Sequence, residues 1–259
     1  MTKLDKDDLK ILSLIVEDAR ASLSKIAKQA KLSREVTYYR LRKMERSLIS
    51  SYQARIDLSM THQEINTLLL NINMADRDKT IKQLTQLPNV HWIGSILGKH
   101  NYAVTFSCDG RLNEFLDLLF HSFPNQIVEY AIGRHLNEYK DSFSGIFNNN
   151  KIITSSTGHQ RVIIDQTDTA IITALAENAR QNNSEIGARY KMTREAIRTR
   201  IKKIEDAGLI INYRTIIKPQ ELDLLSYVLL IRCATTGETS SPICNFLSEH
   251  TSTSYVCSL

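Results

Sequence analysis

Residues 22–46, SLSKIAKQAKLSREVTYYRLRKMER, decide the fold of the N-terminal part of the chain. Ser22 and Ser33 are good N-cap residues, and each precedes a stretch with apolar side chains at helical spacing. Lys31 and Leu32 lie between the two stretches, where a tight turn is expected. The sequence therefore predicts a helix-turn-helix whose second helix follows Ser33.

Another helix precedes this stretch, and a short strand follows it. Asp5 and Asp8, three residues apart, suit the start of a helix. LISSYQARIDL (48–58) alternates enough between apolar and polar residues to predict a short strand or wing. The apolar residues that recur at helical spacing in the first helix are Ile11, Leu12, Ile15 and Val16.

The same pattern occurs twice in the chain. Residues 4–45 align with residues 164–205, and a duplication explains this similarity better than chance. One extra residue, Gly208, then shifts the register, and NTLLLNI (66–72) lies over YVLLIRC (227–233), which predicts a strand in both copies. The matched pairs include Asp5 with Asp165, Asp8 with Asp168, Ala19-Arg20 with Ala179-Arg180, Arg34-Glu35 with Arg194-Glu195, and Arg40 with Arg200.

The positive charge of the chain lies in the two copies. The formal net charge of +5 is one that many proteins without a polyanionic partner also carry. Its distribution is more informative: residues 1–60 contain 13 Lys and Arg against 8 Asp and Glu, and residues 161–220 contain 11 against 7. Residues 61–160 contain 8 against 9, and residues 221–259 contain 1 against 4. Two separate basic segments favour a nucleic acid as the partner.

Comparison of the copies orients the third helix of each. Positions that stay apolar in both should face the core, and Ile197 marks its counterpart Thr37 as inward too. The opposite, basic face would fit the major groove, with its N-terminal side chains near base edges and its basic residues near phosphates. The other inward pairs are Val36/Ala196, Leu41/Ile201 and Met44/Ile204.

A basic run on a single helix is more often a solvated face with partners along the same helix. Its occurrence in two copies, each after a capped turn, favours double-stranded DNA. The predicted DNA-binding residues are Ser33, Arg34, Glu35, Tyr38, Tyr39, Arg40, Arg42 and Lys43 in the first copy, and Thr193, Arg194, Glu195, Arg198, Thr199, Arg200 and Lys202 in the second.

The residues between the basic copies predict a different domain. The expected order is strand, helix, strand, strand, helix, strand, which closes naturally into a ferredoxin-like sheet with two helices on one face. The expected strands are 66–74, 90–97, 102–108 and 126–133, and the expected helices are 76–87 and 111–122.

The predicted fold class is α+β: tandem winged helix-turn-helix domains, each followed by a ferredoxin-like βαββαβ domain, the second incomplete at the C-terminus. This second domain would be cut short, frayed or completed by a partner, since the sequence stops at Leu259, inside its second strand. The predicted boundaries are 1–60 for the first helix-turn-helix domain, 61–140 for the ferredoxin-like ligand and dimerisation domain, 141–161 for a linker, 162–220 for the second helix-turn-helix domain, and 221–259 for the partial second ferredoxin-like domain.

These segments resemble the leucine-responsive regulatory protein/asparagine-regulator (Lrp/AsnC) family of transcription regulators. LDKDDLKIL (4–12), LSREVTYYRLRKME (32–45) and GKHNY (98–102) carry the resemblance, which covers residues 4–140 and, incompletely, 164–259. It implies a DNA-binding regulator that forms homo-oligomers through its ferredoxin-like sheet. The tandem form departs from the usual single unit and predicts two recognition faces that differ, hence an asymmetric DNA site.

The resemblance also implies a small effector, such as an amino acid, near the turn after the second strand of the domain. Asn101 stands where the family often has an aspartate, a departure that disfavours a free amino group as the anchor of the ligand. The alternative is that Gly98 supplies only the hairpin turn and Tyr102 packs in the core. The predicted effector-binding residues are Gly98, Lys99, His100, Asn101 and Tyr102.

Enzyme motifs such as GxSxG, HExxH and Gly-rich phosphate loops are absent from the sequence, and we expect neither enzyme activity nor a cofactor. His91 and His100 could approach each other across the hairpin, but paired surface histidines are more often incidental. Sirohaem decarboxylases resemble the same regulators, and they are expected to bind tetrapyrrole through arginine and histidine; here the arginines concentrate on the third helices. A ligand-sensing or assembly module without DNA binding is a further alternative.

The cysteines and the hydropathy exclude other classes of protein. Cys108, Cys233, Cys244 and Cys257 form no CxxC pair and show no zinc-ligand spacing, so we expect buried reduced thiols and no metal. No apolar run approaches the roughly 18 residues that span a bilayer. We therefore expect no membrane association and a cytoplasmic location.

Overall fold

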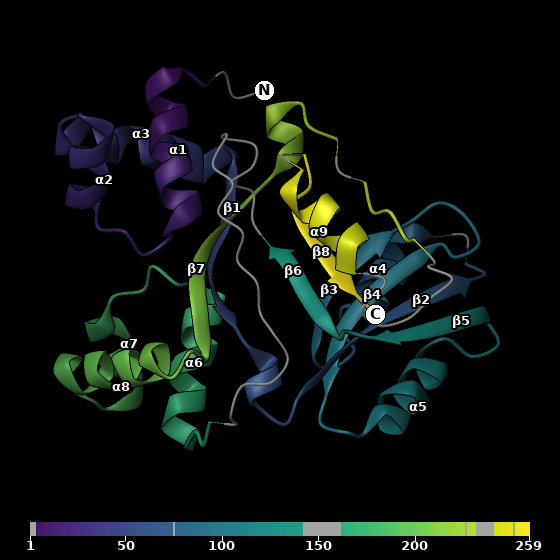
Figure 1. Ribbon diagram of the computed structural model, residues 1–259. Coiled ribbons are helices and arrows are strands. Elements are labelled where there is room, and N and C mark those ends of the chain that lie inside the picture. The colour runs from purple at the N-terminus through teal and green to yellow at the C-terminus, as the bar shows by residue number, and fades with distance from the viewer. Residues whose placement is uncertain (1–3, 75, 142–161, 226, 232–240, 251) are drawn as a thin grey trace. The chain divides into compact units, whose positions relative to one another are not determined.

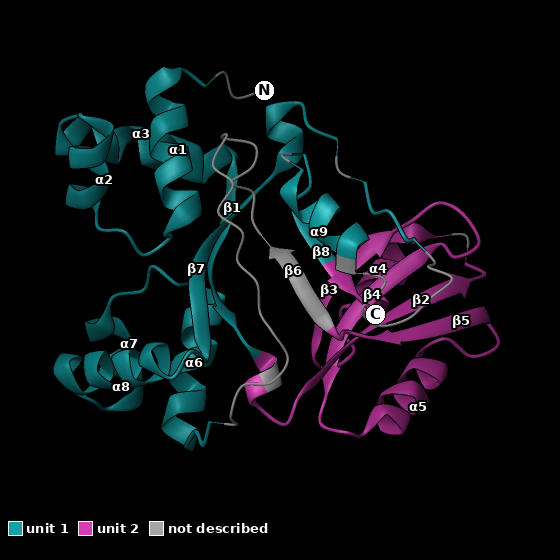
Figure 2. Ribbon diagram, in the orientation of Figure 1, with its two compact units in different colours: residues 1–57, 139–155, 162–256 teal, residues 58–138, 156–161, 257–259 magenta. Residues whose placement is uncertain are grey.

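The computed structural model describes residues 4–74, 76–141, 162–225, 227–231, 241–250 and 252–259, which form two compact units (Figures 1 and 2). Unit 1 comprises residues 1–57, 139–155 and 162–256, and unit 2 comprises residues 58–138, 156–161 and 257–259. Both helix-turn-helix segments thus belong to one unit, whereas the five-part division expected from the sequence remains a prediction. The linker expected at 141–161 lies, apart from Asp141, outside the described residues.

The first head, residues 4–57, consists of three helices and a strand. These are α1 (Lys6–Glu17), α2 (Leu23–Ala30), α3 (Arg34–Ser47) and β1 (Ile49–Ile56). α1 begins with a capping box, in which the carboxylates of Asp5 and Asp8 each accept a hydrogen bond from the other's backbone N–H. The Ser33 hydroxyl caps α3, and Lys31 makes the turn before it in a left-handed conformation, with φ 59°.

The second head, residues 162–218, repeats these devices. Asp165 and Asp168 form the capping box, Thr193 caps the third helix, and Lys191 makes the turn with φ 54°. The elements are α6 (Gln166–Glu177), α7 (Asn183–Tyr190), α8 (Arg194–Asp206) and β7 (Ile210–Ile217). The same side chains at the same spacing therefore produce the same local fold twice, which confirms the repeat.

The two heads share their strands within unit 1 (Figure 1). β1 and β7 pair with each other in an antiparallel, two-stranded sheet. The Ala19 N–H donates to the Tyr213 carbonyl oxygen at 3.0 Å, and the Ala179 N–H donates to the Tyr52 carbonyl oxygen at 2.8 Å. Ile217 of β7 lies in the core of the first head. The strands expected as separate wings are thus one shared sheet, and each head completes the fold of the other.

Unit 2 has the predicted βαββαβ order. Its elements are β2 (Glu64–Ile72), α4 (Arg77–Leu84), β3 (Val90–Ser95), β4 (Tyr102–Cys108), α5 (Leu112–Ser122) and β5 (Ile127–Arg134). The four antiparallel strands have the order β3-β4-β2-β5 of a ferredoxin-like sheet. Phe106 of β4 stacks on Phe115 of α5, with ring centroids 3.7 Å apart, in the core between sheet and helices.

Two expectations drawn from the repeat are wrong. Residues 227–231, expected to form a strand, have no regular secondary structure, and their side chains are exposed. β2 is held between two strands, and residues 227–231 have no such neighbours within the described part of the chain. Val36, expected in the core, is 42% exposed, because Thr37, the next residue of the helix, takes the inward position.

The remaining elements are η1 (Leu58–Met60), β6 (Asn137–Asp141), η3 (Pro219–Leu222), α9 (Ser241–Glu249) and β8 (Tyr255–Ser258).

Among the described residues, no helix is long and apolar enough to cross a bilayer. No group of three or more His, Cys, Asp or Glu among them could hold a metal ion. Cys108 and Cys244 are buried reduced thiols, Cys257 is a reduced thiol that is partly buried, and Cys233 lies outside the described residues.

Candidate nucleic-acid interface

The exposed surfaces of α3 and α8 carry the side chains expected to contact DNA. Tyr38 and Tyr39 of α3 are 51% and 73% exposed. Of the predicted residues, only Arg40 and Arg200 are half-buried. The exposed ones are Ser33, Arg34, Glu35, Tyr38, Tyr39, Arg42 and Lys43 in the first head, and Thr193, Arg194, Glu195, Arg198, Thr199 and Lys202 in the second.

Charged side chains lie at the start of each third helix. The Ser33 hydroxyl accepts a hydrogen bond from the Val36 N–H at 3.2 Å. The backbone N–H of Glu35, and then the Ser33 hydroxyl, hold the pKa of the Glu35 carboxyl below its usual range, so this group is charged at neutral pH. Arg34 and Arg194 are the first residues of their helices and are exposed. Carboxylate and guanidinium groups in this position can accept from and donate to base edges.

Arg40 and Arg200 attach the third helix of each head to the first. Arg40 Nη1 donates to Asp5 Oδ2 at 2.6 Å and to Asp8 Oδ1 at 2.8 Å. Arg200 makes the equivalent two contacts, both at 2.7 Å. Asp8 is 2% exposed, so Arg40 balances a buried charge. The repeat conserves these three side chains for the fold, and a contact of either arginine with DNA remains a prediction.

Hydrogen bonds link the exposed face of α3 to β1. Arg42 Nη1 donates to Glu45 Oε2 at 2.9 Å, and the Tyr52 hydroxyl donates to Glu45 Oε1 at 2.8 Å. Burial, and then the charge of Glu45, raise the pKa of Tyr52 well above its ordinary value, so this hydroxyl keeps its proton. The Arg42 guanidinium lies 5.3 Å from the centroid of the Tyr38 ring. Arg42 is therefore oriented at the surface expected to contact DNA.

Arg20 and Arg180 join the two heads, a role that the sequence did not indicate. The Arg180 guanidinium lies 5.1 Å from the centroid of the Tyr52 ring, and its Nη1 donates to a backbone carbonyl oxygen of the first head at 2.7 Å. The Arg20 guanidinium lies 5.2 Å from the centroid of the Tyr213 ring, and its Nη2 donates to Asn183 Oδ1 at 3.0 Å. The repeat keeps both arginines, but periodicity within one copy gives no sign of a partner in the other.

The turn expected to bind an effector follows β3 in unit 2, and part of it is used by the fold. Asn101 Oδ1 accepts from the Ile72 N–H at 2.9 Å, and Asn101 Nδ2 donates to the Ile72 carbonyl oxygen at 2.8 Å. An aspartate could not make the second bond, which accounts for the amide here. Tyr102 is 6% exposed and packs in the core.

The other residues of this turn are more accessible. Gly98 has φ 131°, a conformation that favours glycine. Lys99 forms an ion pair with Glu129. His100 is half-buried, and its Nε2 has no hydrogen-bond partner in the described part of the chain. His91 lies at the opposite end of the hairpin, so the register does not place it beside His100.

Known proteins are similar to these heads. Residues 4–45 and 164–205 match the family model of the AsnC-type helix-turn-helix domain. The chain carries two AsnC-type helix-turn-helix domains. This match confirms the helix-turn-helix predicted in both copies and their resemblance to Lrp/AsnC regulators.

Solved structures of two kinds also resemble the chain. The siroheme decarboxylase NirDL is 12% identical, with a TM-score of 0.56, over 82% of this chain and 65% of that one. The transcriptional regulator NMB0573 from Neisseria meningitidis, in complex with L-Met, is 20% identical, with a TM-score of 0.48, over 55% of this chain and 96% of that one. LrpC of B. subtilis is 20% identical, with a TM-score of 0.43, over 51% and 94%. No curated protein matches the chain. The likeness to NirDL is one of fold.

Proposed function

We propose that the chain is a transcription regulator that binds double-stranded DNA sequence-specifically through α3 and α8. The observation that carries this proposal is the exposed basic face on the third helix of both AsnC-type domains. Arg34 and Arg194 would donate to base edges near the helix starts, and Arg42 and Lys202 would neutralise phosphates.

The two faces differ in chemistry, so we propose that they recognise different half-sites. Tyr38 and Tyr39 of α3 correspond to Arg198 and Thr199 of α8. Tyrosine rings offer apolar contact to thymine methyl groups, whereas arginine donates to guanine. One chain would then read a composite site with two unequal halves in a fixed order.

Fluorescence anisotropy tests DNA binding directly. The purified chain is titrated with a duplex from the region upstream of its own gene and with a scrambled duplex, at two salt concentrations. We expect tight binding to the first, with an affinity that falls steeply with salt because phosphate contacts release counterions. Absence of binding at low salt would refute the proposal in favour of a sensing or assembly module.

Substitutions separate base reading from phosphate contact. We expect Arg34→Ala and Arg194→Ala each to lower the preference for the native duplex by about 1–3 kcal/mol. Arg42→Ala should weaken binding to native and scrambled duplexes about equally and reduce the salt slope by about one. Unchanged affinity of all three variants would remove these helices from the interface.

A small effector and self-association are further parts of the proposal. The resemblance points to the turn at 98–102. There the side chains of Lys99 and His100 take no part in the hydrogen bonds between Asn101 and the Ile72 backbone. Calorimetric titration of the chain with each common amino acid tests the site, with Lys99→Met and His100→Ala as variants. Light scattering after size-exclusion chromatography measures whether the chain forms homo-oligomers.

Tetrapyrrole decarboxylation is the second candidate function, favoured by the fold similarity to NirDL. Seven of the 17 arginines of the chain lie on the third helices α3 and α8, and this concentration favours DNA binding. Addition of an iron tetrapyrrole decides: a shifted Soret absorbance with saturable binding would support the enzyme, and an unchanged spectrum would leave the regulator.

A further inference from the structure

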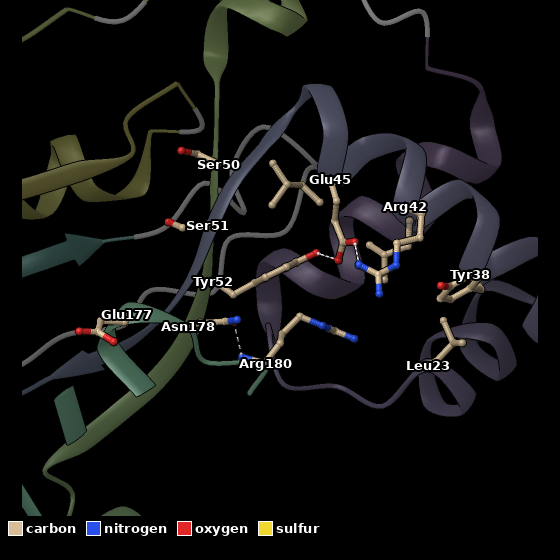
Figure 3. Close-up of a pocket in the computed structure, with 12 residues that line it drawn as sticks. Leu23, Tyr38, Arg42, Glu45, Ser50, Ser51, Tyr52, Glu177, Asn178 and Arg180 are labelled. Carbon is tan, nitrogen blue, oxygen red and sulfur yellow. Dashed lines mark hydrogen bonds and ion pairs between the residues drawn. The ribbon is translucent and has the colours of Figure 1, made fainter. Parts of the chain in front are cut away.

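A cavity of about 600 Å³ lies within unit 1, between α3 of the first head and the loop that joins α6 to α7 in the second (Figure 3). Pockets of this volume commonly enclose small organic ligands. Leu23 and Leu41 provide apolar lining, and Tyr38 adds an aromatic ring. The guanidinium groups of Arg42 and Arg180 point into the same space (Figure 3).

Two cations, Arg42 and Arg180, are among the described residues that line the cavity, and of these Arg180 forms no ion pair. Arg42 pairs with Glu45 at 2.9 Å, and Glu177 pairs with Arg189 at 3.6 Å. The Arg180 guanidinium donates to the backbone carbonyl oxygens of Ala19 and Ala21, lies over the Tyr52 ring, and forms no ion pair with a described residue. A guanidinium that forms no ion pair is suited to a carboxylate, which it can bind through two parallel hydrogen bonds.

The second junction between the heads shows what the cavity lacks. There, Arg20 donates to the side-chain oxygen of Asn183 at 3.0 Å. The residue aligned with Asn183 in the first head is Leu23, which cannot accept a hydrogen bond. The repeat has thus kept the arginine at both junctions but has an apolar side chain in place of the amide at the junction with the cavity.

We propose that this cavity binds a small organic monocarboxylate with an aromatic or apolar body. The carboxylate would accept hydrogen bonds from Arg180, and the body would pack on Leu23, Leu41 and the Tyr38 ring. Arg42 lies both at the cavity and on the face proposed for DNA, so a bound ligand would lower DNA affinity. This last step rests on the proposed function, whereas ligand binding itself does not.

Calorimetric titration of the full chain with 3-phenylpropanoate tests the site, with the uncharged 3-phenylpropanamide as the matched ligand. We expect saturable binding of the carboxylate and binding of the amide that is at least about tenfold weaker. Arg180→Gln should weaken carboxylate binding by about tenfold or more. Leu23→Asn should also weaken it, because the new amide oxygen can accept a hydrogen bond from Arg180, as that of Asn183 accepts one from Arg20. Arg20→Gln, at the other junction, should leave binding unchanged.

Three results would overturn the proposal: no saturable binding at millimolar carboxylate, equal binding of the amide, or equal binding by the parent and both cavity variants. Circular dichroism melts show whether the variants fold. If Arg180→Gln does not fold, the affinity of Leu23→Asn for the carboxylate tests the proposal. An anisotropy titration with the upstream duplex then separates the two proposals. Ligand binding without any DNA binding would refute the regulator and keep the site, whereas DNA binding unaffected by saturating ligand would refute the regulatory coupling.

Discussion

Asp5 and Asp165 are carboxyl groups whose lowered pKa values link the stability of the heads to pH. The pKa of each lies below the ordinary 3.8, for Asp5 because of the Asp8 N–H and then Arg40, and for Asp165 because of Arg200 first. A lowered folded-state pKa adds stability that is present above the unfolded pKa and is lost as pH falls through the folded one.

We therefore expect the free energy of unfolding to decline as pH falls below about 4. The double variant Asp5→Asn/Asp165→Asn should be less stable at neutral pH and should lose less stability on acidification. Urea unfolding between neutral pH and about pH 3 measures both. Curves for parent and variant that stay parallel would contradict the assignment.

Arg40 and Arg42 lie two residues apart in α3 and should behave in opposite ways. Arg40→Met leaves the buried charge of Asp8 unpaired, so we expect the thermal midpoint to fall by about 5 °C or more. Arg42→Met removes an exposed side chain and should change the midpoint little while it weakens DNA binding. Equal midpoints for the two variants would show that the Asp8 pair does not stabilise the head.

Asn101 offers a second residue-level test, in unit 2. Asn101→Asp replaces a donor to the Ile72 carbonyl oxygen with a negative oxygen atom, so we expect a loss of about 1–3 kcal/mol in the free energy of unfolding. Guanidinium unfolding measures it, and protonation of the new carboxyl at low pH should recover part of the loss. A variant as stable as the parent at neutral pH would show that the amide is not needed.

At the level of elements, the sequence predicted the helices whose first residues are capped by side chains nearby in the chain. Ser33, Thr193 and the two aspartate pairs cap their helices, and the sequence predicted these helices because capping needs only side chains a few residues apart. The exchange of β1 and β7 was not predicted, since the partner strands lie about 160 residues apart and their alternation is satisfied by any partner.

In the candidate site too, the sequence predicted local features but not contacts between distant residues. Exposed positions on α3 and α8 follow from helical periodicity, which failed at Val36 because a residue at the edge of the apolar stripe can face either way. Periodicity could not show that Arg40 pairs with Asp8, or that Arg180 reaches the other head, because both contacts depend on tertiary packing.

Because the heads share their strands, a substitution that destabilises one head should also destabilise the other. Ile217 of the second head is 3% exposed in the core of the first, so Ile217→Ala should lower the free energy of unfolding by about 2–4 kcal/mol. Hydrogen exchange should accelerate in α1 of the first head, whereas Ile163→Ala, at a site that is 92% exposed, should have no effect. Faster exchange confined to α6, α7 and α8 would contradict the exchange of strands.

At the scale of the whole molecule, the pairing of the heads would fix the spacing between the two half-sites that the proposed regulator reads together. Insertion of about five base pairs between the half-sites turns one of them to the opposite side of the duplex, and we expect affinity to fall by about 100-fold. Anisotropy titration of a series of spacers measures this dependence. An affinity that does not change with spacer length would mean that the heads bind independently.

If the chain is the proposed regulator, the sheet of β1 and β7 also changes how the supply of paired heads depends on gene dosage. A regulator that assembles its paired heads from separate chains loses the pair on dilution, and at low expression its active form rises with the square of the copy number. Here each translated polypeptide already holds the pair, so the number of paired heads rises in proportion to copy number from the first molecule made. Because α3 and α8 are encoded separately, a codon change in one would alter one half of the proposed operator preference, and the two halves could evolve at different rates.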